Sequence, residues 1–460
     1  MNTHRPPARL LLLSLAISGA IWIVAPNAEA DSQWAGTPGN WSSNSNPGWN
    51  GTGVPNAADA VAAFNAGSSA TTTQDGPLGA GGNVTVGTIK SAGTSNASWT
   101  INANNSITFD VSSGSALIES SRSAVGGHRL NILAGGGSLI LADDLIVRNT
   151  GSGNSILGSI QLNPNITGSG NITFDNPSSN NTAAGQIFLN NASSTSDFSG
   201  NVLVRRGVVL FNDKDQFGGK TSNVITLGEV AKGSVTLVSS TAAGTVVNNI
   251  SVAADTIGAT VLGSISAAST GSTIYSGTVS LNSDLSLTSL NTGSGFVSLS
   301  NTVSGTGSLT KTGAGIAQMS GVNAYTGNTT VSAGTLLLMA GGEQRFKIQD
   351  ANISNAILGS GTLTLNSILR LDISGLTDSF GTWNLVDVGS LSETFGASFG
   401  LAFLSGPTFT DAGSGNFTSG NWSFSQSSGN LVLVPEPGIF GLMGVGGMFV
   451  AFRRRRAMKH

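Results

Sequence analysis

The sequence predicts an all-β fold, built as a solenoid of stacked coils. The first observation is the polar composition: the 460 residues include 64 glycines but only 9% charged residues. Gly, Asn, Ser and Thr supply most of the polar side chains, and these residues favour turns and edges over helix interiors. The second is that no segment between residues 30 and 438 has sustained helical periodicity. The third is a short glycine-led phrase that recurs along the chain.

The composition also excludes some functions. Once the basic residues at the two ends are set aside, the body carries a net negative charge, which does not suit nucleic acid, whose phosphates need a basic face. The chain has no cysteine, so disulfides, thiolate metal sites and a cysteine nucleophile are excluded. A chain of this length can bury enough apolar area to fold without disulfides.

Residues 1–30 form a predicted signal peptide. Arg5 and Arg9 precede an apolar run over residues 10–24, and the motif Ala28-Glu29-Ala30 follows. This order is typical of a secretory signal, so we expect signal peptidase to cleave after Ala30, with Ala28 and Ala30 in its pocket. An uncleaved anchor helix is the alternative, but the run is shorter than the ~20 residues that a span needs.

Residues 31–65 are rich in tryptophan. Trp34, Trp41 and Trp49 are three of the seven tryptophans, and Asp59 and Phe64 follow them. We expect an N-terminal cap that covers the open first coil. The alternative is a platform on which sugars stack.

The solenoid is expected over residues 66–350. Its phrase is a glycine, a small polar residue, an aliphatic residue, any residue and a second aliphatic residue, and such phrases start at Gly137, Gly170, Gly207, Gly233, Gly277, Gly307, Gly334 and Gly361. The phrase alternates inward and outward side chains as a half-buried strand does. A single unit cannot bury its apolar face, so neighbouring coils must stack.

Two longer copies stand out, at residues 303–338 and 166–211. The first contains Gly305-Thr306-Gly307 and Tyr325-Thr326-Gly327-Asn328, and the second contains Phe198-Ser199-Gly200-Asn201 with a ten-residue insertion that we expect to be a loop. The first copy closely resembles the autotransporter-associated β-strand repeat. The resemblance implies a right-handed parallel β-helix, like the passenger of an autotransporter.

Residues 351–434 are expected to form a small C-terminal β-strand module that closes the other end. The expected strands include Leu369–Ile373, Trp383–Val388, Trp422–Phe424 and Leu431–Leu433.

Residues 435–460 form a predicted sorting tail. Pro435-Glu436-Pro437 is followed by an uncharged apolar run over residues 438–452 and then by Arg453, Arg454, Arg455 and Arg456. The order closely resembles the PEP-CTERM sorting signal, which implies that an exosortase-type transpeptidase reads Pro435, Glu436 and Pro437 and removes the tail. The arginines would stop transfer on the cytoplasmic side, so the tail is a transient membrane anchor. An ordinary tail anchor is the alternative. An autotransporter ends instead in a membrane barrel, so this chain is not expected to export itself through an outer membrane.

Few residues suit catalysis. His128 is the one histidine of the body, and nothing near it resembles a nucleophile elbow. Asp143 and Asp144 are adjacent and should point to opposite faces of a strand. Asp213 and Asp215 would share a face, and we expect an inter-coil turn there, with a weak calcium site or catalysis as alternatives. The sequence therefore predicts no catalytic residue, no cofactor and no metal ligand.

The sequence predicts an exported structural or adhesive protein of the cell surface or extracellular matrix, with extracellular polysaccharide as a candidate partner and biofilm as a candidate setting. The alternatives are a β-helix polysaccharide lyase or hydrolase, and a carbohydrate-binding surface module. Because fold alone does not decide between them, a convergent patch of Asp, Arg and Lys on one face would favour the enzyme.

Overall fold

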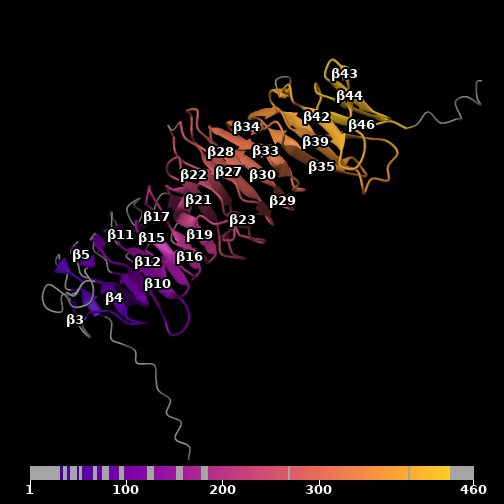
Figure 1. Cartoon of the computed structure of the whole chain (residues 1–460). Coiled ribbons are helices and arrows are strands. Elements are labelled where there is room, and N and C mark those ends of the chain that lie inside the picture. The colour runs from indigo at the N-terminus through magenta and orange to yellow at the C-terminus, as the bar shows by residue number, and fades with distance from the viewer. Residues whose placement is uncertain are drawn as a thin grey trace, which may run out of the picture.

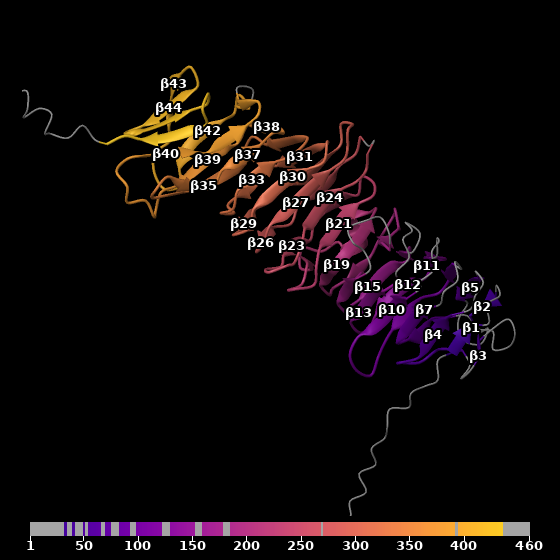
Figure 2. The same ribbon diagram turned by 180° about the vertical axis from the view of Figure 1, so that it is seen from behind.

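The computed structural model describes residues 32–34, 39–41, 49–50, 54–65, 70–74, 82–92, 98–121, 129–151, 159–177, 185–267, 270–391 and 394–435. These residues form an elongated column of parallel strands, with the N-terminal and C-terminal parts at opposite ends (Figures 1 and 2). Within these residues there are strands and one short 3-10 helix but no α-helix. The predicted all-β solenoid is therefore confirmed.

The column has three faces, each a ladder of parallel strands from successive turns. The first face consists of β4 (Val61–Phe64), β7 (Thr88–Ser91), β10 (Ala116–Ser120), β13 (Leu145–Asn149), β16 (Ile172–Asp175), the first half of β19 (Val202–Phe211), β20 (Val224–Leu227), β23 (Asn249–Val252), β26 (Val279–Leu281), β29 (Val303–Gly305), β32 (Val322–Asn323), β35 (Glu343–Gln349), β39 (Ile368–Asp372) and β42 (Gly400–Phe403).

The second face consists of β2 (Gly39–Asn40), β5 (Ala70–Gln74), β8 (Trp99–Ala103), β11 (Arg129–Ala134), β14 (Ser159–Leu162), β17 (Ile187–Leu189), the second half of β19, β21 (Val235–Ser239), β24 (Thr260–Ser264), β27 (Leu285–Ser289), β30 (Leu309–Thr312), β33 (Thr329–Val331), β37 (Ile357–Gly359) and β41 (Val386–Val388).

The third face is divided into two sheets, and the solenoid as a whole has about 11 turns. The first sheet contains β6 (Val84–Val86), β9 (Ile107–Phe109), β12 (Ser138–Leu141), β15 (Asn165–Gly168) and β18 (Asp197–Phe198). The second contains β22 (Gly244–Val246), β25 (Thr273–Tyr275), β28 (Phe296–Leu299), β31 (Ile316–Met319), β34 (Thr335–Leu338) and β38 (Thr362–Leu365). The 3-10 helix η2 (Lys214–Phe217) contacts β18 and β22 and takes the place of a strand between them.

The core is a continuous column of side chains along the axis. In β8, for example, Trp99, Ile101 and Ala103 are buried while the residues between them are half-buried. This alternation is the pleat of a strand with one face inside. Each strand buries its inner side chains against those of the turns above and below, which is why the coils must be stacked to be stable.

The recurrent phrase leads into a strand at each of its eight starts, Gly207 opening the second half of β19, but it does not return to the same face. Gly137 leads β12 on the third face, Gly170 leads β16 on the first, and Gly307 leads β30 on the second. The uneven spacing of the phrases is therefore not the length of a coil. The reason is that every face needs the same pattern, namely a tight turn followed by alternating inward aliphatic side chains.

The two longer repeat copies are offset by one face. Phe198 of the earlier copy lies in β18 on the third face, whereas Tyr325 of the later copy follows β32 on the first face. Their local packing is nevertheless the same. A Cβ atom on Gly200 would overlap the backbone of Gly170, and one on Gly327 would overlap that of Gly307. Part of the expected insertion loop, residues 178–184, lies outside the described residues.

The asparagine that follows each of these glycines bonds to the next turn. Asn201 Oδ1 accepts a hydrogen bond from Val224 N at 2.9 Å, and Asn328 Oδ1 accepts one from Ala356 N at 2.9 Å. The glycine thus allows close contact with the previous turn, and the asparagine satisfies a backbone donor of the next one. This pairing gives the Gly-Asn step of the repeat its physical reason.

Parallel stacking continues past residue 350, although the sequence predicts that the C-terminal module starts at residue 351. β35 pairs in parallel with β39, and β39 with β42. The length of a turn varies, because Val303 pairs with Asn323 whereas Ile368 pairs with Gly400. Longer turns carry loops outside the three faces.

A separate antiparallel sheet covers the C-terminal end of the column. Its strand order is β40 (Gly381–Asn384), β46 (Asn430–Leu433), β45 (Trp422–Ser425), β44 (Asn416–Ser419) and β43 (Thr410–Gly413). β40 comes from the chain between β39 and β41, so this sheet and the last turns of the solenoid are interleaved in sequence. Trp383 stacks on Trp422 with ring centroids 5.6 Å apart. At the other end, β1 (Ser32–Trp34) pairs with β3 (Trp49–Asn50) and with β4, and within the C-terminal turns β36 (Ile353–Ser354) pairs with β35.

Candidate functional site

The described part of the chain ends at Pro435, and we call this end the exit. β46 lies between β40 and β45, and after it Val434 N donates a hydrogen bond to Asn421 O at 3.1 Å. Val434 and Pro435 are both exposed. The first proline of the Pro-Glu-Pro motif is therefore the last described residue of the body. Glu436, Pro437 and Arg453–Arg456 lie outside the described residues, as do Ala28 and Ala30 of the signal and His128.

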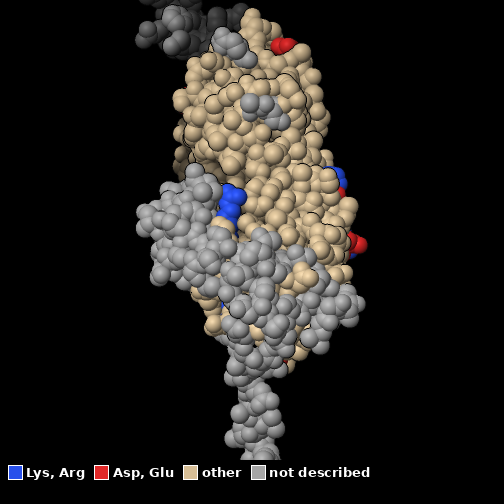
Figure 3. All heavy atoms as spheres, turned by 90° about the vertical axis from the view of Figure 1, so that its left-hand side faces the viewer, with Lys and Arg blue, Asp and Glu red and all other residues tan. Residues whose placement is uncertain are grey.

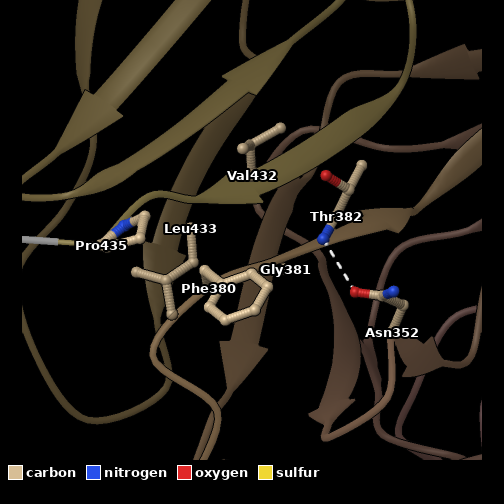
Figure 4. Close-up of a pocket in the computed structure, with 7 residues that line it drawn as sticks. All are labelled: Asn352, Phe380, Gly381, Thr382, Val432, Leu433 and Pro435. Atoms are coloured by element: carbon tan, nitrogen blue, oxygen red, sulfur yellow. Dashed lines mark hydrogen bonds between the residues drawn. The ribbon is translucent and has the colours of Figure 1, made fainter.

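A pocket of about 370 Å³ lies beside this exit (Figure 4). Phe380 and Leu433 lie together below Pro435, and Gly381 is paired with Leu433 across the sheet. Thr382 N donates to Asn352 Oδ1 at 2.9 Å, which fixes the loop on the far side. The pocket is lined by Asn352, Phe380, Gly381, Thr382, Val432, Leu433 and Pro435. Sequence reasoning misses this site, because its residues come from three distant segments.

The three N-terminal tryptophans are buried rather than displayed. Trp34, Trp41 and Trp49 are 2%, 0% and 3% exposed. The ring of Trp49 lies 5.1 Å from that of Trp34 and 5.5 Å from that of Phe64, and its Nε1 donates to Trp41 O at 2.8 Å. Buried rings cannot stack on a sugar. Their burial argues against the sugar platform and favours the cap.

The segment from Asp213 to Asp215 forms an inter-coil turn. Asp213 caps η2, with its carboxylate accepting from Asp215 N at 2.9 Å, and Gln216 Oε1 accepts in return from Asp213 N at 3.2 Å. Lys214 pairs with Asp215. These contacts occupy both carboxylates in local structure, which supports the turn over the calcium or catalytic alternatives.

Three other carboxylates approach one another at Asp59, Asp110 and Asp143. Slight desolvation, a hydrogen bond with Asp143 and the charges of Asp143 and Asp59 together raise the pKa of Asp110. Asp143 Oδ2 accepts a hydrogen bond from Val111 N at 2.9 Å. The adjacent Asp144 does not face the same group, and its Oδ1 accepts one from Asn171 N at 2.8 Å. Among the described residues no group of three or more His, Cys, Asp or Glu side chains is arranged to hold a metal ion.

Charged residues are few and scattered on the face shown in Figure 3. Along the first face of the column, by contrast, charged residues form a row in which positive and negative side chains alternate from turn to turn. Paired positions on successive strands carry Lys90, Glu119, Arg148, Asp175 and Arg206. We call this row the charge ladder. Opposite charges on directly paired positions stabilise a sheet and disfavour a slip in register.

Asp175 forms ion pairs with Arg148, Arg205 and Arg206. It is 3% exposed, and its Oδ1 lies 2.6 Å from Arg206 Nε. Burial alone would raise the pKa of Asp175, but the hydrogen bond and charge of Arg206 and the charges of Arg205 and Arg148 bring it below the usual value. A carboxylate held ionised in this way cannot supply or take up protons near neutral pH. The ladder is therefore better suited to structure than to catalysis.

A second charged group lies near the C-terminal end of the same face. Arg370 Nε lies 3.1 Å from Glu343 Oε1, and Arg345 Nη2 lies 3.7 Å from Glu343 Oε2. Arg345 also lines a cavity of about 100 Å³ with Lys347 and Asp372. A hydrogen bond from Ser374 is the main cause that lowers the pKa of Asp372, with smaller effects from Lys347 and Arg345.

Lys311, in the later repeat copy, is a buried amine. It is 0% exposed, and its Nζ donates to the carbonyl oxygens of Thr312 and Gly313 at 2.7 Å each and of Ala333 at 3.0 Å. Burial lowers the pKa of Lys311 to about 8. The amine therefore remains charged at neutral pH and joins two consecutive turns.

Two family models match the chain. Residues 433–456 match the PEP-CTERM protein-sorting motif, and residues 309–338, from β30 to β34, match the passenger-associated-transport-repeat. No match was found to a curated protein or to a solved structure. Both features that the sequence predicts by resemblance are confirmed. Together with the solenoid they indicate a protein exported to the cell envelope or surface, and neither model describes an enzyme family.

No helix with the length and apolar character of a membrane span is present in the part of the chain that the structure describes. The expected transient anchor, residues 438–452, lies outside that part.

Proposed function

We propose that the chain is a structural or adhesive protein of the cell surface or extracellular matrix, and that an exosortase-type enzyme removes its tail. The observation that carries the proposal is the position of Pro435. It is exposed and lies two residues after Leu433, the last residue of the final strand of the folded body. An enzyme outside the body can therefore reach the motif without unfolding any strand.

Further steps of the proposal concern the two ends. Signal peptidase cleaves after Ala30, so the mature chain starts at Asp31. Residues 31–65 cap the first coil, and the module within residues 351–434 closes the last one. Arg453–Arg456 hold the tail on the cytoplasmic side until the enzyme has acted.

A structural or adhesive role is supported by the design of the column. Stacked coils give a long and regular surface, and the opposite charges on paired positions of the charge ladder stabilise its register. Extracellular polysaccharide is the candidate partner that we propose for this surface.

A polysaccharide lyase or hydrolase is the second candidate. The observation that favours it is the small cavity lined by Arg345, Lys347 and Asp372. A basic residue there could bind the carboxylate of an acidic sugar, and the neighbouring aspartate could act in proton transfer. Incubation of the purified protein with acidic polysaccharides tests this. Release of unsaturated or reducing ends that is lost in Lys347→Ala would establish the enzyme.

The sorting proposal is tested by replacing Glu436, which lies outside any membrane-spanning run. We expect Glu436→Ala to leave a membrane-held precursor, whereas the wild type loses its tail. Asp387→Ala is the matched control, since it removes an exposed acid elsewhere in the C-terminal region. Mass spectrometry of surface protein would follow peptides from Phe440 to Lys459. Full abundance of these peptides in the wild type would mean that the tail is a plain anchor.

A further inference from the structure

Three exposed apolar residues lie in, or next to, the segments that line the pocket beside Pro435. Phe380 is 65% exposed, Ile353 58% and Val434 49%. Phe380 lines the pocket, Ile353 follows the lining residue Asn352, and Val434 lies between the lining residues Leu433 and Pro435. We call these three residues, together with the pocket, the exit patch. Phe380 is the one aromatic residue among the large apolar side chains that are exposed in the described residues.

The residue after Phe380 packs closely on Trp383. A Cβ atom on Gly381 would come within 2.5 Å of the Trp383 ring, because residues 381 and 383 of β40 share one face of the strand. Trp383 itself is 0% exposed, and its Nε1 donates to Gln349 O at 2.8 Å. Trp383 thus fills the buried side of β40, whereas Phe380, just before this strand, is exposed and its apolar ring is available to a partner.

The sorting motif is tied closely to this patch. Glu436 follows Pro435 directly, and the apolar run starts three residues after Pro435. An extended chain spans at most ~3.6 Å per residue, so at most ~11 Å can separate Pro435 from the start of that run. Proline also restricts the direction in which the chain leaves. Any enzyme that reads Glu436 must therefore approach the surface that contains Phe380.

We infer that the exit patch is a docking surface for the sorting enzyme, which inserts an apolar side chain beside Phe380 while it reads Pro435-Glu436-Pro437. The inference rests on the proposed function, since it names a second contact between the same two proteins. It commits to the enzyme as occupant because the motif and the pocket share Pro435. A small apolar pocket next to a short linear motif adds affinity that the motif alone does not supply.

The test compares Phe380→Ser with Ile257→Ser in pulse–chase measurements of tail removal in the native host. Ile257 is 60% exposed on the solenoid and is the matched control. We expect Phe380→Ser to slow removal about tenfold, which corresponds to about 1.4 kcal/mol, and Phe380→Leu and Ile257→Ser to keep the wild-type rate. An unchanged rate in Phe380→Ser, or equal slowing in both serine variants, would overturn the inference.

A second variant separates docking from folding. Six Gly-Ser residues inserted between Val434 and Pro435 leave the module and the motif intact but move the motif away from the patch. We expect this insertion to slow removal, and we expect Phe380→Ser to cause no further slowing when it is combined with the insertion. Removal at the wild-type rate would contradict docking. The two proposals fail in different ways. If the wild type keeps its tail, the sorting proposal itself fails. If the wild type loses its tail and Phe380→Ser loses it at the same rate, only the docking inference fails.

Discussion

At the scale of single residues, the repeat is explained by close contact between turns. Gly327 stacks on Gly307, and Asn328 bonds to Ala356 N of the next turn. The sequence shows that these residues recur, but it does not show which turn each one touches. That information depends on coil length, which varies along the column.

A substitution at Gly327 tests the close contact. In Gly327→Ala the new methyl group would overlap the carbonyl of Gly307, and we expect the free energy of unfolding to fall by about 2 kcal/mol, as in other overpacked sites. Gly375→Ala is the control, because no atom lies within 4 Å of the position of its Cβ. Urea unfolding of both variants measures the difference. Equal stability of the two would contradict the stacking.

Lys311 gives the column a pH dependence of known sign. Burial lowers the pKa of the folded amine to about 8, from an ordinary value of 10.5. Between these values the unfolded chain keeps a proton that the folded chain has lost, so this residue makes stability rise with pH. Below about pH 8 both forms are charged, and the effect is absent.

We therefore expect the wild type to gain stability over Lys311→Met as pH rises from 8 to 9.5, by about 1 kcal/mol per pH unit. Lys311→Met is the reference for the wild type, because the two proteins share all other titrating groups. Urea unfolding at pH 7, 8.5 and 9.5 gives the two profiles. Parallel profiles would mean that the amine stays charged in the folded protein throughout.

At the scale of elements, the sequence predicts strands well and their placement poorly. All eight glycine-led phrases lead into strands, yet these strands are distributed over all three faces. A strand on any face needs one inward row of aliphatic side chains, so the pattern cannot distinguish the faces. The interleaving of β40 with the last turns is also invisible in sequence, since Trp383 meets Trp422 only in the fold.

The N-terminal end offers a test at this scale. Trp49 packs against Trp34, Trp41 and Phe64, and we expect Trp49→Ala to destabilise the first turns by about 3 kcal/mol. Because each coil contacts only its neighbours, the loss should remain local. Amide hydrogen exchange should accelerate in β4 and β7 but not in β35 and β39. Uniform acceleration along the column would contradict a separate cap.

At the scale of the whole molecule, buried aromatic rings pack together near one end of the column, and an antiparallel sheet lies at the other, where the described residues end at Pro435. The sequence predicts the sorting motif from residues 435–456 alone, because such a motif is a linear signal. It does not predict the exit patch, since the pairing of β40 with β46 brings Phe380 near Leu433, and a hydrogen bond from Thr382 N holds Asn352 beside them.

We propose above that the folded body is exported and trimmed at both ends. The intact mass of the wild-type protein recovered from the cell surface is the decisive measurement. We expect a chain that starts at Asp31 and lacks the apolar run and Arg453–Arg456. A surface protein with the mass of the complete chain, from Met1 to His460, would contradict it.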